Sequence, residues 1–482
     1  MSHSFSRRAF LGATAAGAGA VLFSDRFSGR SVLAGEGGVS PELPPVAIHT
    51  IYVGKRGAAW PKPAFDPRAE MAKFEKPLAD AATELGDVKF VGGELVQTPD
   101  EAANLAARLK DADAVLVMHL SLNTLPELQA LVDAGRPTVV FSQPFSGHEW
   151  MFVNNWRKGG KRVCVFATSD HAELARAAAL LRVPARMRQS RIVLIGPADG
   201  TPAARSAEQV RQRLGTQVVP VAADRLIEAH KAVDPKVAEA EAEQYWLRAA
   251  RKVIEPSREE VIKSARMYFA MASIMAAERA QAITIRCLGG IPIDVIGYPC
   301  LGFSKLLDRG LVGACEADMD STLMMLMFRY AFGVPGFITD PLFDTAKNAV
   351  IHAHCTAPTR MDGPAGPRAP FTIRTHRDDD KGAALEVEMK VGQTITCAKL
   401  VNLDTMLVST GRIIEIPDID DRGCRTQITT EVADARRMLD NFGAGLVEGW
   451  VPQLHRVVFY GDHMRDVQHL GALMGFKVLE AI

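Results

Sequence analysis

The strongest constraint on the fold is an alternation of short apolar runs with segments whose apolar residues repeat at helical spacing. The alternation starts after a Pro-rich stretch at 41–45, and the apolar run at 46–53 predicts the first strand. Strands that alternate with helices predict a parallel sheet covered by helices on both faces. The next expected elements are a helix at 99–109 capped by Thr98, a strand at 114–118, a helix at 126–134 and a strand at 138–141.

The same alternation restarts further along the chain and then gives way to another pattern. Strands are expected at 163–166, 191–196 and 282–286, with helical segments between them. From about residue 346 the strands become short, partly alternating and separated by Gly-containing turns, which is typical of an antiparallel β domain. We therefore predict an α/β fold with two Rossmann-like domains built on parallel sheets, followed by a mainly antiparallel β domain. The expected divisions are a signal and linker at 1–40, α/β domains at 41–165 and 166–345, and a β domain at 346–482.

The N-terminus contains the three parts of a secretory signal. A charged head with Arg7 and Arg8 precedes an apolar stretch at 13–23, and small residues at 31–34 could end it. The paired arginines before Phe10 favour the twin-arginine (Tat) version of this signal. We expect a periplasmic or otherwise exported protein that has no membrane attachment after the signal is cleaved; a disordered basic tail is the alternative.

Composition argues against two classes of function. The chain holds 56 Lys and Arg against 56 Asp and Glu, and such a balance is atypical of a dedicated nucleic-acid binder. No apolar run reaches the roughly 18 residues that a transmembrane helix needs. We expect no nucleic-acid partner and a small-molecule ligand.

Two acids, Glu316 and Asp340, end short apolar runs on either side of an apolar helical stretch at 321–332. A strand–helix–strand unit in one sheet is almost always a right-handed crossover, so both acids are expected at the carboxyl ends of parallel strands. If the strands are neighbours, about 4.8 Å apart, the two carboxylates repel each other unless a cation or a proton lies between them. A hard divalent cation satisfies that need, and ligands of open sheets bind at this edge. The alternative is a pair of ordinary solvated or capping acids, as Asp318 and Asp320 are best interpreted.

Several segments around and beyond these acids resemble a known family. They are Cys315-Glu316-Ala317-Asp318, Leu323-Met324-Met325, Phe337-Ile338-Thr339-Asp340, the turn and strand from Gly392 to Leu400, and the C-terminal positions His455, Val457, Tyr460, Gly461, Asp466 and Leu470. Together they resemble the L-fucose isomerase family, whose general fold the L-arabinose isomerases share. The resemblance covers the second and third expected domains well and the first only by architecture.

This resemblance implies a site and an activity. It implies a manganese-type divalent metal held by Glu316, Asp340 and His455, in a barrel-like third domain and the domain before it. It further implies that the metal bridges O1 and O2 of an open-chain sugar and that the carboxylates move a proton between C1 and C2 through an enediol. We therefore expect an intramolecular oxidoreductase, an aldose–ketose isomerase dependent on manganese, with Glu316 and Asp340 as its catalytic pair. The family also implies a homotrimer or a homohexamer.

Two other histidines, His463 and His354, compete for a place at this site. His463 is close to His455 in the sequence, but the spacing to Tyr460 favours His455 as the ligand. His354 resembles an additional histidine ligand of arabinose isomerases, so contact with the metal or substrate and a purely structural role both stay open. His352 would share the face of His354 on an extended segment, and strand geometry does not separate the two.

The seven cysteines show no paired spacing of the Cys-x-x-Cys type, and their odd number does not suggest a disulfide scaffold. Cys315 and Cys355 lie next to the candidate ligands Glu316 and His354. Thiolates are poor partners for a hard cation, so we interpret both cysteines as packing residues.

One loop of the first domain suits a sugar. Residues 142–150 follow the strand at 138–141 and combine aromatic with polar side chains, among them His148 and Trp150. Aromatic rings pack on the C–H face of a sugar while polar groups bind its hydroxyls. In the family that the sequence resembles, the first domain can cover the active site of a neighbouring subunit. His148 and Trp150 are therefore candidate substrate contacts, with a structural loop as the alternative.

Two other functions fit the same residues. Export is unexpected for a sugar isomerase, so the chain could instead epimerise a sugar, or catalyse β-elimination or hydration of an oxidised one, with the same metal and acid/base pair. A non-catalytic carbohydrate-binding protein is the other alternative. Such a binder has no need for two carboxylates on a cation, which favours an enzyme.

Overall fold

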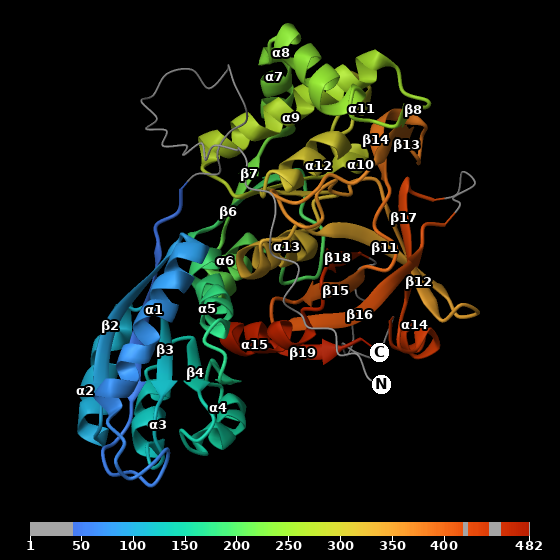
Figure 1. Ribbon diagram of the computed structural model, residues 1–482. Coiled ribbons are helices and arrows are strands. Elements are labelled where there is room, and N and C mark those ends of the chain that lie inside the picture. Colours follow the sequence, from blue (N-terminus) through green and yellow to red (C-terminus); the bar gives the residue numbers. More distant parts are fainter. Residues whose placement is uncertain (1–41, 418–422, 443–454, 482) are drawn as a thin grey trace, which may run out of the picture. The chain divides into compact units, whose positions relative to one another are not determined.

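The computed structural model describes residues 42–417, 423–442 and 455–481. The expected export signal at 1–40 lies outside the described residues. Within those ranges, no helix is both long enough and apolar enough to cross a membrane. Figure 1 labels the helices and strands along the chain.

The first part of the described chain forms a five-stranded sheet in which every pairing is parallel. Its elements and the helix that follows are β1 (Val46–Val53), α1 (Pro67–Leu85), β2 (Val88–Val96), α2 (Pro99–Arg108), η1 (Leu109–Asp111), β3 (Ala114–His119), α3 (Leu125–Asp133), β4 (Thr138–Ser142), η2 (Glu149–Phe152), α4 (Val153–Lys158), β5 (Val163–Ala167) and α5 (Glu173–Gln189). The strand order is β2-β1-β3-β4-β5. Leu116 of β3 packs in a core with α1 and α5, whereas its neighbour Val117 packs with α2 and α3, so helices cover both faces (Figure 1). Helix α2 starts at the predicted cap, where Thr98 and Glu101 form a reciprocal capping box.

A second parallel sheet follows, with the strand order β10-β9-β6-β7. This part contains β6 (Arg191–Ile195), α6 (Ala207–Leu214), β7 (Gln217–Val221), α7 (Ala223–Ala232), α8 (Pro235–Glu241), η3 (Ala242–Leu247), β8 (Lys252–Val253), α9 (Arg258–Glu278), β9 (Ala282–Ile285), α10 (Cys287–Gly290), α11 (Ile293–Ile296), α12 (Cys300–Asp308), β10 (Val312–Ala314) and α13 (Met319–Phe332). Val193 of β6 packs in a core with α9 and α12, and the adjacent Ile192 packs in another core with α5 and α13. This sheet too is covered on both faces.

The last part of the chain forms a closed antiparallel barrel. This part of the chain contains β11 (Phe337–Asp344), β12 (Ala349–His354), β13 (Phe371–His376), β14 (Lys381–Val387), β15 (Thr394–Val401), β16 (Thr405–Glu415), β17 (Thr426–Glu431), α14 (Ala435–Phe442), β18 (Arg456–Tyr460), α15 (Met464–Met474) and β19 (Lys477–Glu480). The ring runs β15-β18-β11-β12-β17-β16 and closes because β16 also pairs with β15, while β19 adds to β16 in parallel. Strands β8, β13 and β14 form a separate small sheet. Parallel α/β sheets followed by an antiparallel barrel confirm the predicted fold class.

The expectation that Glu316 and Asp340 end neighbouring parallel strands is wrong. Glu316 follows β10, which pairs with β9 in the second parallel sheet, whereas Asp340 lies within β11, which pairs antiparallel with β12 and β18. Helix α13 between them is buried on nearly all sides, and it packs in one core with residues of both the sheet and the barrel. A helix that is apolar all round fits between two layers, so this strand–helix–strand unit links two sheets instead of crossing over within one.

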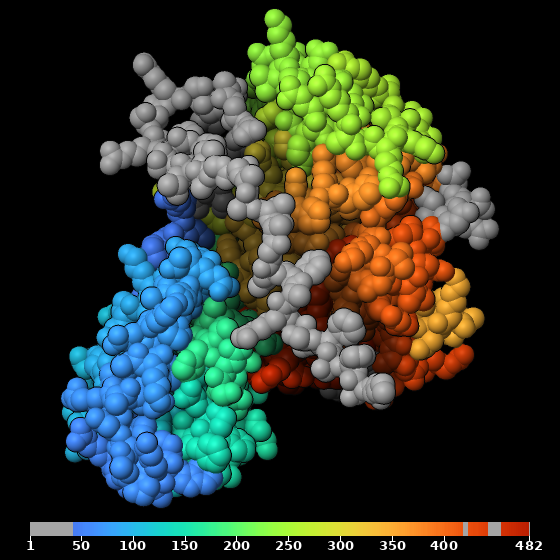
Figure 2. All heavy atoms as spheres, in the orientation of Figure 1, coloured from blue at the N-terminus to red at the C-terminus, as the bar shows by residue number. Residues whose placement is uncertain are grey.

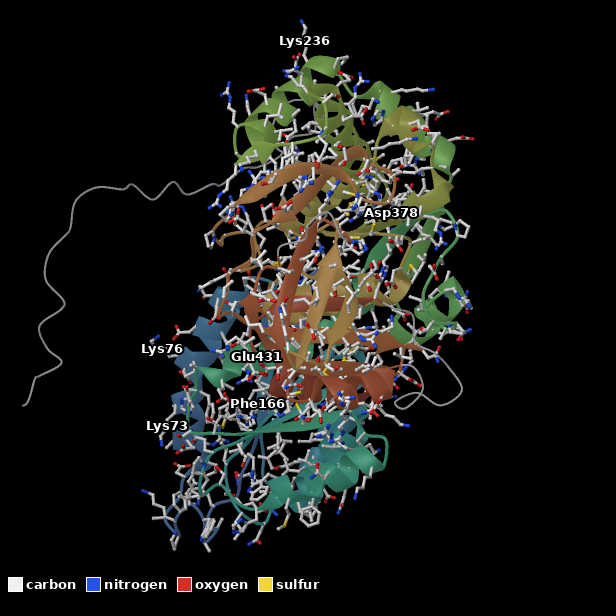
Figure 3. All side chains as sticks on the ribbon, turned by 90° about the vertical axis from the view of Figure 1, so that its right-hand side faces the viewer. Lys73, Lys76, Phe166, Lys236, Asp378 and Glu431 are labelled. Carbon is white, nitrogen blue, oxygen red and sulfur yellow. The ribbon has the colours of Figure 1, made fainter. Side chains whose placement is uncertain are left out.

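Core and surface side chains are clearly separated in the first part of the chain. Phe166 of β5 is buried, whereas Lys73 and Lys76 on α1 extend from the surface (Figure 3). The heavy atoms of the first sheet and its helices, blue to teal in Figure 2, form a continuous packed surface on the face shown.

Candidate metal centre

Glu316 reaches the site through an unusual stretch of backbone after β10. Glu316 and Ala317 have φ angles of 60° and 58°, in the left-handed region that side chains other than glycine rarely adopt. The turn is held by Ala317 N–H, which donates to the Ile285 carbonyl at 2.9 Å, and by Asp318 N–H, which donates to the Cys315 carbonyl at 3.1 Å. Each such residue costs about 1–3 kcal/mol and persists only where the surroundings fix it, most often at functional sites.

The barrel supplies three side chains that meet Glu316. Asp340 comes from the middle of β11, His354 from the end of β12, and His455 directly precedes β18. The Nε2 atom of His455 lies 3.4 Å from Asp340 Oδ1 and 3.6 Å from Glu316 Oε2. The Nε2 atom of His354 lies 3.6 Å from Glu316 Oε1. The structure thus brings together the three residues predicted as ligands, and His354 with them.

The donor set and its exposure fit a divalent cation. One ligand atom each from Asp340, His354 and His455 lies within 4.8 Å of the others. The two histidines are buried, while the carboxylates of Glu316 and Asp340 are 27% and 30% exposed, so a ligand can reach them. Carboxylate oxygens combined with imidazole nitrogen suit first-row divalent ions such as Mn²⁺.

Asp318 orients His455 from behind. Its side chain is fully buried, and its Oδ2 accepts a hydrogen bond from His455 Nδ1 at 3.0 Å. The same carboxylate caps α13 by accepting from Ser321 N–H at 3.1 Å. When Nδ1 carries the proton and donates it to Asp318, the lone pair of Nε2 is left to coordinate a metal. This nitrogen faces the carboxylates of Glu316 and Asp340, an arrangement common among metal-binding histidines.

The charges of the cluster shift its pKa values in a consistent direction. Burial acts to raise the pKa of Glu316, but the hydrogen bond to His354 and the charges of both histidines outweigh it and lower that pKa. Burial acts to lower the pKa of His455, and the bond to Asp318 with the nearby carboxylates raises it instead. Burial acts to raise the pKa of Asp318, yet the bond to His455 and the charge of Lys399 bring it well below its usual range. The lowered pKa values keep the carboxylates of Glu316 and Asp318 ionised, and their negative charge favours a cation in the cluster.

His463 and His352, the other two histidines considered in the sequence, do not join the candidate metal centre. His463 stacks on Phe332 with ring centroids 4.1 Å apart and bonds through Nε2 to the Tyr460 carbonyl at 2.9 Å. His352 points into the barrel between the hydroxyls of Thr339 and Thr430, at 3.1 and 3.2 Å. Its neighbour His354 instead bonds through Nδ1 to a hydroxyl at 3.3 Å and directs Nε2 to Glu316.

His148 and Trp150 are exposed at the edge of the first sheet. The ring of His148 lies 4.7 Å from that of Trp60 and 6.4 Å from that of Trp150. Phe145, which is 68% exposed, joins the group through Trp60. Across the described part of the chain, the ring contacts of His148 and Trp150 are with each other and Trp60 and do not involve the metal-centre residues.

Sequence reasoning missed three contributors. Asp318 was expected only as a cap, because its contact with His455 joins residues far apart in the chain. Lys399, which is 1% exposed and lies 4.0 Å from Asp320, was not singled out. Cys287 was overlooked, although its sulfur lies 3.3 Å from that of Cys315. A basic residue inside an otherwise uncharged strand, as Lys399 is in β15, was the available signal.

These observations define a class of protein: two parallel α/β sheets and a closed antiparallel barrel, with a candidate divalent-cation centre formed where β10 meets the barrel strands. Curated relatives of this chain include proteins described as sulfoquinovose isomerase. The chain is 25% identical over 246 residues to those of Priestia aryabhattai and Priestia megaterium, which covers 49% of this chain and 53% of the relative. It is 23% identical over 250 residues to that of Alkalicoccus urumqiensis, which covers 49% and 54%. The chain thus spans about half the length of the curated relatives it matches. No family model matches it.

Proposed function

We propose that this protein is an aldose–ketose isomerase that acts on a sugar and depends on a divalent metal, with Mn²⁺ as the best fit. The observation that carries the proposal is the approach of Glu316 and Asp340 to one histidine nitrogen, at 3.6 and 3.4 Å. The name of the curated relatives supports a sugar isomerase. The resemblance to L-fucose isomerases supports the enediol route.

In this proposal Glu316, Asp340 and His455 hold the cation, and Asp318 keeps His455 in place. The bound cation supplies a Lewis acid that stabilises negative charge developing on two sugar oxygens. One of the two exposed carboxylates removes the proton from C2 and returns it to C1, while a proton moves from O2 to O1. The lowered pKa of Glu316 suits that carboxylate to act as the base in the first of these steps.

The substrate and the assembly are also proposals. Sulfoquinovose is the first sugar to test because it is in the relatives' name, with L-fucose and L-arabinose beside it. We propose a homotrimer or homohexamer in which His148 and Trp150 of one subunit contact sugar bound to the next. Export through the Tat pathway to the periplasm is part of the same proposal.

The test is solvent exchange. The metal-loaded protein is incubated with each sugar in D₂O, and both deuterium uptake and products are followed. The proposal predicts that one sugar gains deuterium and converts to its ketose. Glu316→Gln should reduce the rate by about 10²–10⁴-fold, the usual contribution of a general acid or base.

Glu388→Gln is the matched control, because the Glu388 side chain is 40% exposed and, among the contacts described, forms an ion pair only with Arg251. Unchanged turnover in Glu316→Gln overturns the role given to Glu316. Exchange that yields an epimer or an elimination product overturns the isomerase assignment and retains the site. Sugar that binds without any exchange indicates a carbohydrate-binding protein.

A further inference from the structure

Two buried thiols lie beside the candidate metal centre. Cys287 follows β9 and Cys315 follows β10, and these two strands are paired neighbours in the second sheet. Their Sγ atoms are 3.3 Å apart, and the two residues are only 1% and 2% exposed. Both residues belong to the apolar core of the second sheet, which is the packing role expected for Cys315, and the close sulfur contact adds a second feature.

Further donors gather around one of the two sulfurs, that of Cys315. One ligand atom each from Cys315, Glu316 and His354 lies within 4.8 Å of the others. Cys315 directly precedes the strained turn that carries Glu316, so the sulfur pair lies next to that turn. His354 uses Nδ1 for its bond to Thr356, which leaves Nε2 as the available donor.

We propose that Cys287, Cys315, His354 and Glu316 form a second cation site, selective for thiophilic divalent ions of the zinc and cadmium class. Two thiolates, one imidazole and one carboxylate are the four donors that such ions take in tetrahedral sites. On binding, two metal–sulfur bonds form and the two thiol protons leave to the solvent. The proposal goes beyond the isomerase function and does not rest on it, since these donors are present whether or not a sugar is converted.

The site has a consequence for the neighbouring centre. His354 and Glu316 also face His455 and Asp340, so a thiophilic ion bound at the sulfurs removes two donors from the oxygen-rich centre. A hard ion such as Mn²⁺ avoids sulfur and leaves the thiols free. The cysteines therefore make the protein sensitive to the kind of divalent metal around it, and zinc-class ions compete with manganese.

The test is a titration of the reduced, chelator-stripped full chain with Cd²⁺ and no sugar. The ultraviolet absorption band of thiolate-to-cadmium charge transfer is the readout. We expect a band that saturates at about one Cd²⁺ per chain. Cys287→Ser should weaken Cd²⁺ affinity by more than about tenfold and remove about half of the band, because even outer partners of metal ligands contribute that much affinity.

Two further variants make the result decisive. His354→Gln should weaken Cd²⁺ affinity while the intensity at saturation stays, because both thiolates remain. Cys164→Ser is the matched control, since Cys164 is equally buried but lies on β5 of the first sheet, and it should leave the titration unchanged. Absence of the band in reduced protein, or an equal loss in Cys164→Ser and Cys287→Ser, overturns the second site. Because no turnover is measured, such a failure is independent of the isomerase proposal.

Discussion

The buried carboxylate of Asp318 links the folding of helix α13 to the geometry of the candidate metal centre. One of its oxygens caps the helix, and the other accepts from His455 at 3.0 Å. Lys399 supplies a nearby buried positive charge that offsets the cost of burying this carboxylate and that of Asp320. A single residue thus sets both where the helix begins and which nitrogen of His455 faces the cation.

Asp318→Asn separates these two roles. Asparagine caps a helix about as well as aspartate, so α13 should stay folded. His455 loses a charged acceptor, and Mn²⁺ affinity should fall by about 10–100-fold, the usual effect of losing such a partner. A Mn²⁺ titration followed by electron paramagnetic resonance measures the change, and a thermal melt verifies the fold.

Asp320→Asn is the matched control for that experiment. It too removes a buried charge near Lys399, but Asp320 bonds to Thr201, at 2.6 and 2.7 Å, and not to His455. Its Mn²⁺ affinity should stay close to that of the unmodified protein. Equal losses in both variants would mean that the buried charge matters and the contact with His455 does not.

At this scale the sequence allowed a good part of the site to be predicted. The positions of Glu316 and Asp340 indicated a shared cation, His455 came only from the family resemblance, and the structure brings the three together. The second role of Asp318 and the pairing of Cys287 with Cys315 depend on tertiary contacts. A local pattern of caps and apolar residues contains no information about such contacts, so both were beyond sequence reasoning.

At the scale of elements, β10, α13 and β11 show how a correct local prediction led to a wrong arrangement. Both strands and the helix were expected, but the crossover rule applies only when the two strands share a sheet. The deciding signal was the helix itself, since residues such as Leu323, Met324 and Phe328 leave it no polar face. A helix buried on all sides must pack between two layers of the fold, and for α13 these layers are the second sheet and the barrel.

Helix α15 gives a prediction on pH at the same scale. His469 on this helix packs against Phe166 of β5, with ring centroids 4.8 Å apart. Burial, with added repulsion from Arg465, Arg176 and Arg157, lowers the pKa of His469 to about 4. The pKa of a histidine in an unfolded chain is about 6.5. Between pH 4 and pH 6.5 the proton therefore binds more readily when α15 has opened than when it is packed. The free energy needed to open this contact is therefore greatest above about pH 6.5, and it falls by about 2 kcal/mol by pH 5.

Hydrogen–deuterium exchange of α15 peptides at pH 7 and pH 5, corrected for intrinsic rates, measures this loss. His469→Gln stays neutral at both values, so its α15 should show a smaller difference in protection between them than the unmodified protein. An identical pH response in both proteins would exclude His469 as the source.

For the molecule as a whole, the fold class could be predicted because the spacing of apolar residues along the sequence distinguishes helices from strands and shows their order. The βα alternation predicted two covered parallel sheets, and the short strands after residue 346 predicted an antiparallel domain. Closure of the barrel did not follow from the strand pattern and came only from the family resemblance. It depends on the extra pairing of β16 with β15, which joins strands already placed in the sheet. The exposed group around Trp60 and Phe145 is the surface on which the proposed assembly depends.

The central claim is that Glu316, Asp340 and His455 form one divalent-metal centre, and metal content tests it most directly. Elemental mass spectrometry is applied to the protein loaded with Mn²⁺ and freed of excess ions, beside His455→Ala and His463→Ala. We predict about one manganese per chain in the unmodified protein and in His463→Ala, since His463 stacks on Phe332 outside the cluster. His455→Ala should lose most of the metal. A protein that takes up no divalent metal, or one in which His455→Ala retains it fully, contradicts the account.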